Sequence, residues 1–185
     1  FYPFPVGYRY DYCNPDALLT RLSVKDGQWT TPDGITYPLL WIPQPGRMQP
    51  ETVERLLELV KQGGVLVADA PTGIATLGQS NRQKERFLAA VSALWPQSGQ
   101  KERTLGQGRV LSGISLENAL RHLNIAPDVN GIGNQWLHRK TEGADWYFVC
   151  ADRETPFNGE VEFNCTGRVE IWNPVNGTVK EIPST

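Results

Sequence analysis

The chain has 185 residues with 18 Lys and Arg against 20 Asp and Glu, which gives a formal net charge of −2. A hydrophobic fraction of 39% and a charged fraction of 21% are typical of a globular protein and exclude disorder of the whole chain. Such a balanced charge provides no global field to attract nucleic acid, so we expect no nucleic-acid partner. The length fits one large domain or two small ones.

The longest apolar runs are too short to cross a bilayer. They cover residues 39–42, 65–68 and 146–151, whereas a spanning helix needs about 20 apolar residues. We therefore expect no membrane partner, and no secretory signal is visible at the start. The sequence begins at Phe1 rather than at Met, as a processed chain or an excised fragment would.

Four segments in the first two thirds of the chain carry helix signals. Each begins with an Asn or Ser cap, or with a Pro in the first turn, and continues with apolar residues at helical spacing. The predicted helices cover residues 15–23, 50–62, 81–95 and 116–123.

Short apolar runs alternate with these helices and predict buried strands at residues 37–43, 65–68 and 108–111. This alternation is typical of an α/β fold in which helices cover both faces of a parallel sheet. We assign residues 1–130 to that α/β domain. Residues 131–185 predict an antiparallel β segment, either the start of a β-sandwich or a sheet docked on the α/β core. Its expected strands lie at residues 134–140, 146–151, 161–165, 169–173 and 178–182.

The common catalytic and cofactor motifs are missing from the sequence. No G-x-S-x-G nucleophile elbow and no phosphate-binding glycine loop occurs. The three cysteines, Cys13, Cys150 and Cys165, form no CxxC pair, and whether any two of them pair stays open. With His122 and His138 as the only histidines, we expect no metal site and no cofactor, and we nominate no catalytic residue.

Three places remain as candidate sites. One is the cluster Tyr10-Asp11-Tyr12 with Asp16, either an exposed aromatic–acidic surface or the packing of the entry segment. Asp69 follows a predicted strand, where it is either a ligand-binding carboxylate or a turn cap. Two later strands bring His138, Arg139, Asp145 and Trp146 within reach of one another. The Arg fork suits sugar hydroxyls, and aromatic faces suit sugar rings, so we nominate these four residues as substrate-binding. The alternative is an ion pair that closes a hairpin over a Trp-rich core.

A series of motifs resembles one family. The motifs are Tyr10-Asp11-Tyr12-Cys13-Asn14-Pro15-Asp16-Ala17-Leu18, Pro32-Asp33-Gly34-Ile35-Thr36-Tyr37, Leu137-His138-Arg139-Lys140, Asp145-Trp146-Tyr147-Phe148-Val149 and Ile171-Trp172-Asn173-Pro174 with Gly177. Their order is similar to the region behind the catalytic barrel in bacterial glycoside hydrolases of family 106, the α-L-rhamnosidase-like enzymes. Cys150-Ala151-Asp152 departs from the family pattern, where the resemblance leads us to expect an Asn-bearing segment.

The resemblance implies a glutamine-amidotransferase-like, flavodoxin-like α/β domain that leads into β structure. It also implies a parent enzyme that is secreted or periplasmic and degrades polysaccharide. The remainder of that enzyme and carbohydrate are the expected partners, and the chain alone is expected to be a non-catalytic accessory fragment. The alternatives are a small autonomous glycoside hydrolase and a self-association module like the trimerisation domains of some β-galactosidases.

Overall fold

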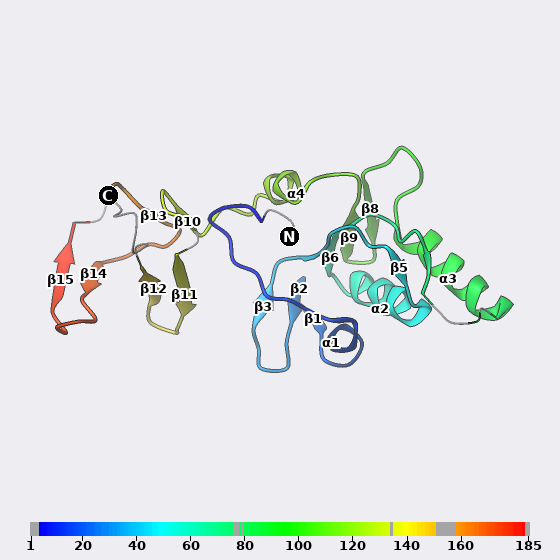
Figure 1. Cartoon of the computed structure of the whole chain (residues 1–185), viewed down its shortest axis with the longest axis horizontal. Helices are drawn as coiled ribbons and strands as arrows, with labels where there is room; N and C mark the ends of the chain where they lie inside the picture. Colours follow the sequence, from blue (N-terminus) through cyan, green and yellow to red (C-terminus); the bar gives the residue numbers. More distant parts are fainter. Residues whose placement is uncertain (1–3, 76–77, 79, 134, 151–157, 184–185) are drawn as a thin grey trace. The chain divides into compact units, whose positions relative to one another are not determined.

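The computed structural model describes residues 4–75, 78, 80–133, 135–150 and 158–183. The chain forms two compact units, which we name the α/β unit and the β unit (Figure 1). The α/β unit comprises Phe1–Phe4 and Tyr10–Ile125, and the β unit comprises Pro5–Arg9 and Ala126–Thr185. The segment Pro5–Arg9 therefore belongs to the same unit as the C-terminal third of the chain.

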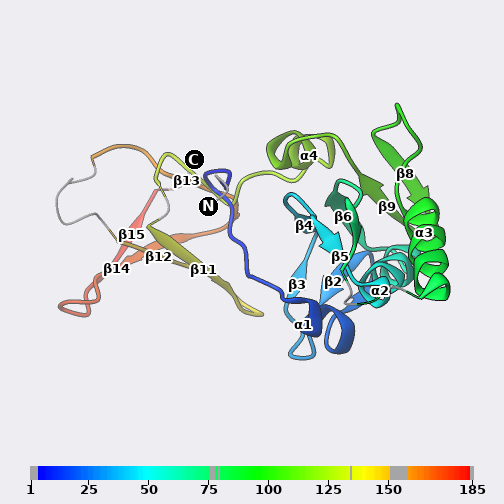
Figure 2. The ribbon, with the colours of Figure 1, turned by 45° about the vertical axis from the view of Figure 1, so that its right-hand side comes forward.

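A four-stranded sheet forms the centre of the α/β unit, in the order β4-β6-β9-β8 (Figure 2). β4 and β6 are parallel, as are β6 and β9, whereas the edge strand β8 pairs with β9 in an antiparallel hairpin. The bounds are β4 (Leu40–Ile42), β6 (Val65–Ala68), β8 (Glu102–Leu105) and β9 (Gly108–Leu111).

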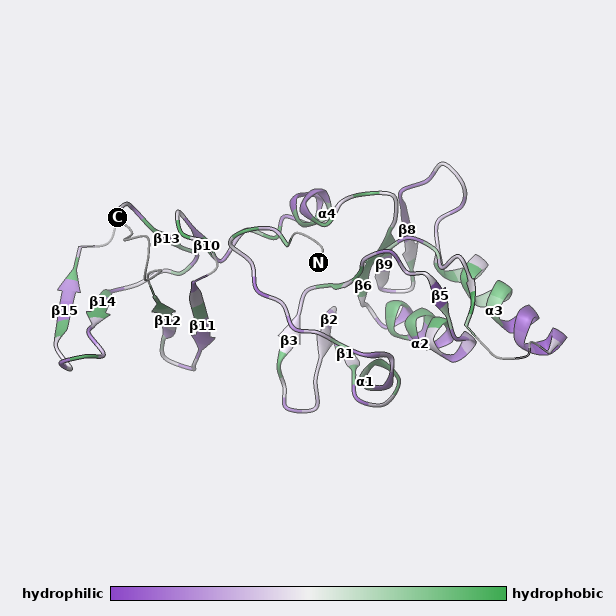
Figure 3. Cartoon of the chain, viewed as in Figure 1, coloured by the Kyte–Doolittle hydropathy of each residue, from purple (hydrophilic) through white to green (hydrophobic). Residues whose placement is uncertain are grey.

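The helices begin where the sequence places their caps. Asn14 accepts a hydrogen bond from the amide of Ala17, and Ser80 and Gln83 form a reciprocal capping box. The N-terminal half of α3 is hydrophilic, and its apolar residues follow toward its C-terminal end (Figure 3). The bounds are α1 (Pro15–Thr20), α2 (Pro50–Lys61), α3 (Asn81–Leu94) and α4 (Leu116–His122).

Alternate residues of the central strands point to two separate apolar clusters. Leu66 and Val110 belong to the cluster formed with α2 and α3. Val67 and Leu111 belong to the second cluster, with Ala119 of α4. Helices therefore cover both faces of this sheet, as the sequence predicts, because strands with two buried faces are apolar at successive positions.

Five shorter strands complete the α/β unit. A three-stranded antiparallel sheet consists of β1 (Ser23–Lys25), β2 (Gln28–Thr30) and β3 (Thr36–Tyr37), and β5 (Arg47–Met48) pairs in parallel with β7 (Gly73–Ile74). Trp29 in β2 is buried, and its indole N–H donates to the carbonyl of Val65 at 2.8 Å. This bond ties the small sheet to the first residue of β6.

The described residues of the β unit form three two-stranded antiparallel sheets. They are β10 (Val129–Asn130) with β13 (Glu162–Phe163), β11 (Trp136–Lys140) with β12 (Asp145–Val149), and β14 (Val169–Trp172) with β15 (Val179–Ile182). Val129, Ile132 and Trp136 form its small core.

The segment Pro5–Arg9 is bound into the β unit. The carbonyl of Gly7 accepts from the amides of Asp128 at 2.7 Å and Val129 at 3.3 Å. The guanidinium of Arg9 lies 4.3 Å from the ring centre of Trp136, a cation–π contact. These contacts join segments that are far apart in the sequence.

The observed elements confirm a mixed α/β chain, but most strand pairings outside the central sheet are antiparallel. The three parallel strands β4, β6 and β9 follow the chain in simple order. The described strands therefore lack the reversal of strand order at which flavodoxin-like sheets bind ligands. Of the expected strand positions, residues 134 and 151 lie outside the described residues. No helix among the described residues is long and apolar enough to span a membrane.

Candidate functional site in the β unit

The β11–β12 hairpin separates its side chains onto two faces, because successive residues of a strand point in opposite directions. His138 lies opposite Tyr147, and Lys140 lies opposite Asp145. Arg139 pairs with Trp146 at the intervening position. The four nominated residues therefore divide: His138 and Asp145 share one face, and Arg139 and Trp146 share the other.

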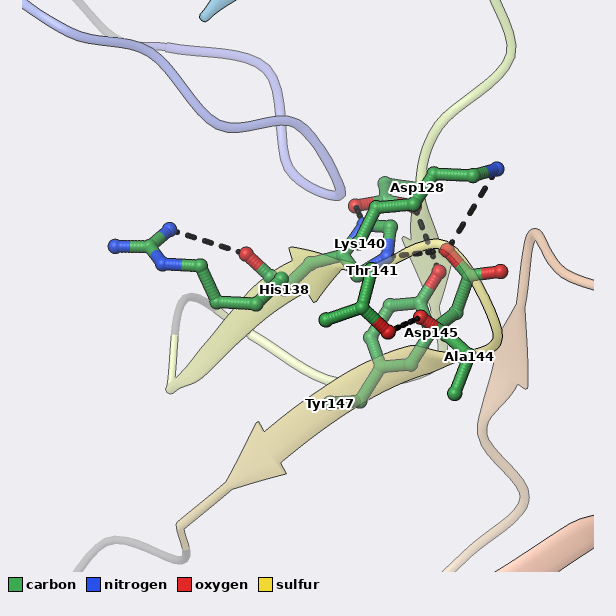
Figure 4. Close-up of polar contacts among 8 residues, drawn as sticks. Asp128, His138, Lys140, Thr141, Ala144, Asp145 and Tyr147 are labelled. Atoms are coloured by element: carbon green, nitrogen blue, oxygen red, sulfur yellow. Dashed lines mark hydrogen bonds and ion pairs between the residues drawn. The ribbon is translucent and has the colours of Figure 1, made fainter. Parts of the chain in front are cut away.

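His138 lies between two carboxylates (Figure 4). Its Nδ1 is 2.8 Å from Oδ2 of Asp128, and its Nε2 is 2.9 Å from Oδ1 of Asp145. The side chain is only 20% exposed, and its ring stacks on that of Tyr147 with centroids 4.2 Å apart. Both ring nitrogens are thus engaged within the protein, so His138 orients the carboxylates and leaves a ligand no ring nitrogen to bind.

Tyr147 completes this cluster by stacking against the imidazole ring of His138. Its hydroxyl donates to Oδ1 of Asp128 at 2.9 Å, so Asp128 accepts from Tyr147 through one oxygen and faces His138 with the other. Burial, followed by the hydrogen bond to Asp128, raises the pKa of Tyr147 well above its usual range. The hydroxyl of Tyr147 therefore keeps its proton near neutral pH, where it acts as a hydrogen-bond donor and not as an acid or base.

Asp145 also borders a hollow of about 480 Å³. Polar side chains dominate its wall, and they come from β10, from β13, from the adjoining ends of β11 and β12, and from the segment after β13. The ammonium of Lys140 lies 3.8 Å from Oδ1 of Asp145, and Asn130 donates to Oε2 of Glu162 at 3.2 Å. The polar residues that line the hollow include Asn130, Lys140, Asp145, Glu162, Asn164 and Thr166.

Arg139 and Trp146 face solvent on the other side of the hairpin. Trp146 is 47% exposed, and its ring meets that of Trp172 edge-on with centroids 5.5 Å apart. Leu137 and Phe148, which pair across the same face, are also more than half exposed. This face is an apolar surface with one cation, which we name the outer face.

Asp69 links two strands of the central sheet. Its Oδ1 accepts from the hydroxyl of Ser112 at 2.9 Å and from the amide of Gly113 at 2.6 Å. These bonds join the carboxyl ends of β6 and β9.

Sequence reasoning missed Asp128 and Glu162. Asp128 lies in a loop before β10, and its sequence neighbours carry no periodic signal that would place it beside His138. Glu162 belongs to a polar–apolar alternation, Glu160-Val161-Glu162-Phe163, which predicts a strand with one wet face but not the ligand-sized hollow beside it.

Cysteine and metal chemistry find no support among the described residues. Cys13, Cys150 and Cys165 are free thiols. Burial raises the pKa of the Cys13 and Cys165 thiols, which favours the unreactive protonated form. Within the described ranges, no group of three or more His, Cys, Asp or Glu side chains is placed to hold a metal ion.

The comparisons with known proteins all match glycoside hydrolases. A protein of Formosa agariphila named "Putative beta-glucuronidase" is 29% identical over 178 residues, which is 95% of this chain and 15% of that protein. The solved structure of a rhamnosidase from Novosphingobium sp. PP1Y matches with a TM-score of 0.85 and 27% identity, over 97% of this chain and 18% of that one. The model of the α-L-rhamnosidase family, glycoside hydrolase family 106, matches residues 2–185. The chain therefore belongs to glycoside hydrolase family 106, and it spans less than a fifth of the length of these two relatives.

Proposed function

We propose that the chain is a non-catalytic accessory region of an α-L-rhamnosidase-like glycoside hydrolase that degrades polysaccharide. In this proposal it braces the catalytic barrel, contacts sugar, and is secreted or periplasmic together with its parent enzyme. The observation that carries the proposal is the coverage of its relatives, since almost all of this chain matches only 15–18% of each of them.

The outer face supports the bracing role. Leu137, Trp146 and Phe148 are each about half exposed on one side of a two-stranded hairpin. A contiguous exposed apolar surface is typical of a protein contact, and a two-stranded sheet is marginally stable until something packs against it. The remainder of the parent enzyme is the partner that we propose for this face.

Hydroxyl-radical footprinting tests the bracing role. Trp146 and Phe148 should react readily in the isolated chain and at least several-fold more slowly within the full-length enzyme. Trp95, which is 4% exposed, should react slowly in both and serves as the internal control. Equal reactivity of Trp146 in the two samples would contradict bracing by this face.

We also propose that the nominated residues contact sugar at two places, through Arg139 and Trp146 on the outer face and through Asp145 in the hollow. Arg139 and Trp146 offer a donor fork and an exposed indole face, whereas Asp145 offers an acceptor in the hollow and His138 orients it. Calorimetric titration of the chain with methyl α-L-rhamnopyranoside should give millimolar binding. The absence of heat at saturating sugar would remove the carbohydrate part of the proposal and leave the bracing part.

A second candidate is a small autonomous hydrolase. One observation favours it: two carboxylates, those of Asp145 and Glu162, border the same hollow, and glycoside hydrolysis uses a pair of carboxyl groups. Turnover of aryl glycosides by the purified chain that disappears in both Asp145→Asn and Glu162→Gln would establish it. No turnover by the wild-type chain would favour the accessory role.

The exposed outer face also keeps a self-association module as an alternative. Light scattering distinguishes self-association from the accessory role, because a monomer of 20.7 kDa at high concentration would count against self-association.

For the α/β unit, we propose a relationship to glutamine-amidotransferase-like domains. Three parallel strands with helices on both faces support this relationship.

A further inference from the structure

We propose that the hollow of the β unit binds a single neutral sugar ring. The inference rests on the carbohydrate part of the proposed function, and it names the place and the class of ligand. It uses Asn130, Lys140, Glu162 and Asn164, which lie outside the set nominated from the sequence.

The size of the hollow fits a small ligand. Its volume of about 480 Å³ lies within the range of ~300–1,000 Å³ that is usual for small-molecule sites. Ala126, Pro127 and Phe163 also contribute to its wall, which gives the C–H face of a sugar ring an apolar surface to pack on. A mixed wall of this kind suits a ligand with one apolar side and several hydroxyl groups.

The charges of the wall select against anionic ligands. The carboxylates of Asp145 and Glu162 accept hydrogen bonds, the ammonium of Lys140 donates, and the Asn130 and Asn164 amides offer both functions. An anion would meet two carboxylates against one ammonium. A sugar hydroxyl both donates and accepts, so a neutral polyhydroxyl ligand can satisfy every one of these groups.

The acceptors are held in place before any ligand binds. His138 lies 2.9 Å from Asp145, and Asn130 donates to Glu162 at 3.2 Å. Groups that are already ordered lose little conformational entropy on binding. Lys140 differs, since its side chain is 77% exposed and its ammonium lies 3.8 Å from Asp145, beyond hydrogen-bond distance.

Nuclear magnetic resonance of the whole chain tests the site, with the side-chain amides of Asn130 and Asn164 as reporters. Methyl α-L-rhamnopyranoside is the neutral probe and D-glucuronate is the acidic one. The neutral probe should shift both amides at millimolar concentration, and glucuronate should not. Lys140→Met should weaken binding by about tenfold, because it removes a charged donor. Lys180→Met, on exposed β15 and outside the hollow, is the matched control and should leave the dissociation constant unchanged.

Glu162→Gln provides a second variant that preserves shape and replaces one charged acceptor oxygen with an amide donor, and it should also weaken binding of the neutral probe. Shifts confined to Trp146 and Trp172 would overturn the hollow as the site while the proposed sugar contact stands. Binding of glucuronate as tightly as the neutral probe would overturn the ligand class. No shift anywhere would overturn this inference together with the carbohydrate contact, and the footprinting result would still decide the bracing role.

Discussion

At the scale of single residues, the hydrogen-bond capacity of His138 governs the β unit. Both ring nitrogens of His138 lie within hydrogen-bond distance of a carboxylate oxygen, with Nδ1 facing Asp128 and Nε2 facing Asp145. The residue therefore acts as an internal cross-link between the loop before β10 and the start of β12.

We expect His138→Leu to destabilise the β unit by about 1–3 kcal/mol, because it leaves Asp128 and Asp145 partly buried without their shared partner. Thermal unfolding followed by the resonances of β11 and β12 measures the loss. His122→Leu is the matched control. His122 is half exposed and makes one contact, at 2.9 Å to Glu102, so its loss should cost less than about 0.5 kcal/mol. Equal losses for both variants would contradict the cross-link.

Tyr147 predicts an alkaline limit for the same unit. Its pKa is raised in the folded state, mainly by burial and then by its bond to Asp128. An unfolded tyrosine ionises at about 10, so the stabilisation is fully present below that pH and is lost as pH rises above it. Tyrosinate absorbance should reveal one tyrosine that ionises only as the β unit unfolds. Tyr147→Phe should abolish that step, and a step that persists in this variant would contradict the assignment.

At the scale of elements, the starts of the two long helices differ. Ser80 and Gln83 cap α3 through a reciprocal pair of hydrogen bonds, whereas Gln49 before α2 makes no side-chain cap bond. Ser80→Ala should therefore cost about 1 kcal/mol of stability in the α/β unit, and Gln49→Asp should add about 0.5–1 kcal/mol. Denaturant midpoints of the two variants should move in opposite directions. A shift of both in the same direction would contradict the capping assignment.

Close packing of backbone against backbone fixes where α2 and β9 meet. A Cβ added at Gly108 would lie 2.1 Å from the carbonyl oxygen of Val60 and 2.4 Å from that of Gly64. Gly108→Ala must push these segments apart and should destabilise the α/β unit by about 3 kcal/mol or more. Gly46→Ala is the control, because a Cβ there meets no atom within 4 Å. Comparable unfolding midpoints for the two variants would contradict this packing.

At the scale of the whole molecule, elements specified by local signals could be predicted and long-range pairings could not. The four helices and the strands β6 and β9 follow from caps, glycine stops and apolar runs within a few residues. The residues around Trp29 do not indicate that it is buried in the core, because its hydrogen-bond partner, Val65, lies in another segment. For the site, hairpin spacing predicted that His138 and Asp145 lie together. The contribution of Asp128 depends on a fold that local patterns do not encode.

The contact of Gly7 with Val129 supplies a prediction for the whole chain. A Cβ at Gly7 would lie 2.4 Å from the carbonyl oxygen of Val129, and its φ of +87° favours glycine. Gly7→Ala should therefore destabilise the β unit by about 2–4 kcal/mol and leave the α/β unit intact. Gly34→Ala, at φ +83° with no atom within 4 Å of a Cβ, is the control for strain alone. Loss of dispersed resonances from both units in Gly7→Ala would contradict the assignment.

That same backbone bond has a consequence for biosynthesis. A ribosome delivers Gly7 before it delivers Asp128 and Val129, whose amides bind its carbonyl. These hydrogen bonds can form only after the intervening residues have emerged. We therefore expect nascent chains stalled before residue 128 to present an α/β unit that resists protease, with a segment around Gly7 that is cleaved readily until translation proceeds.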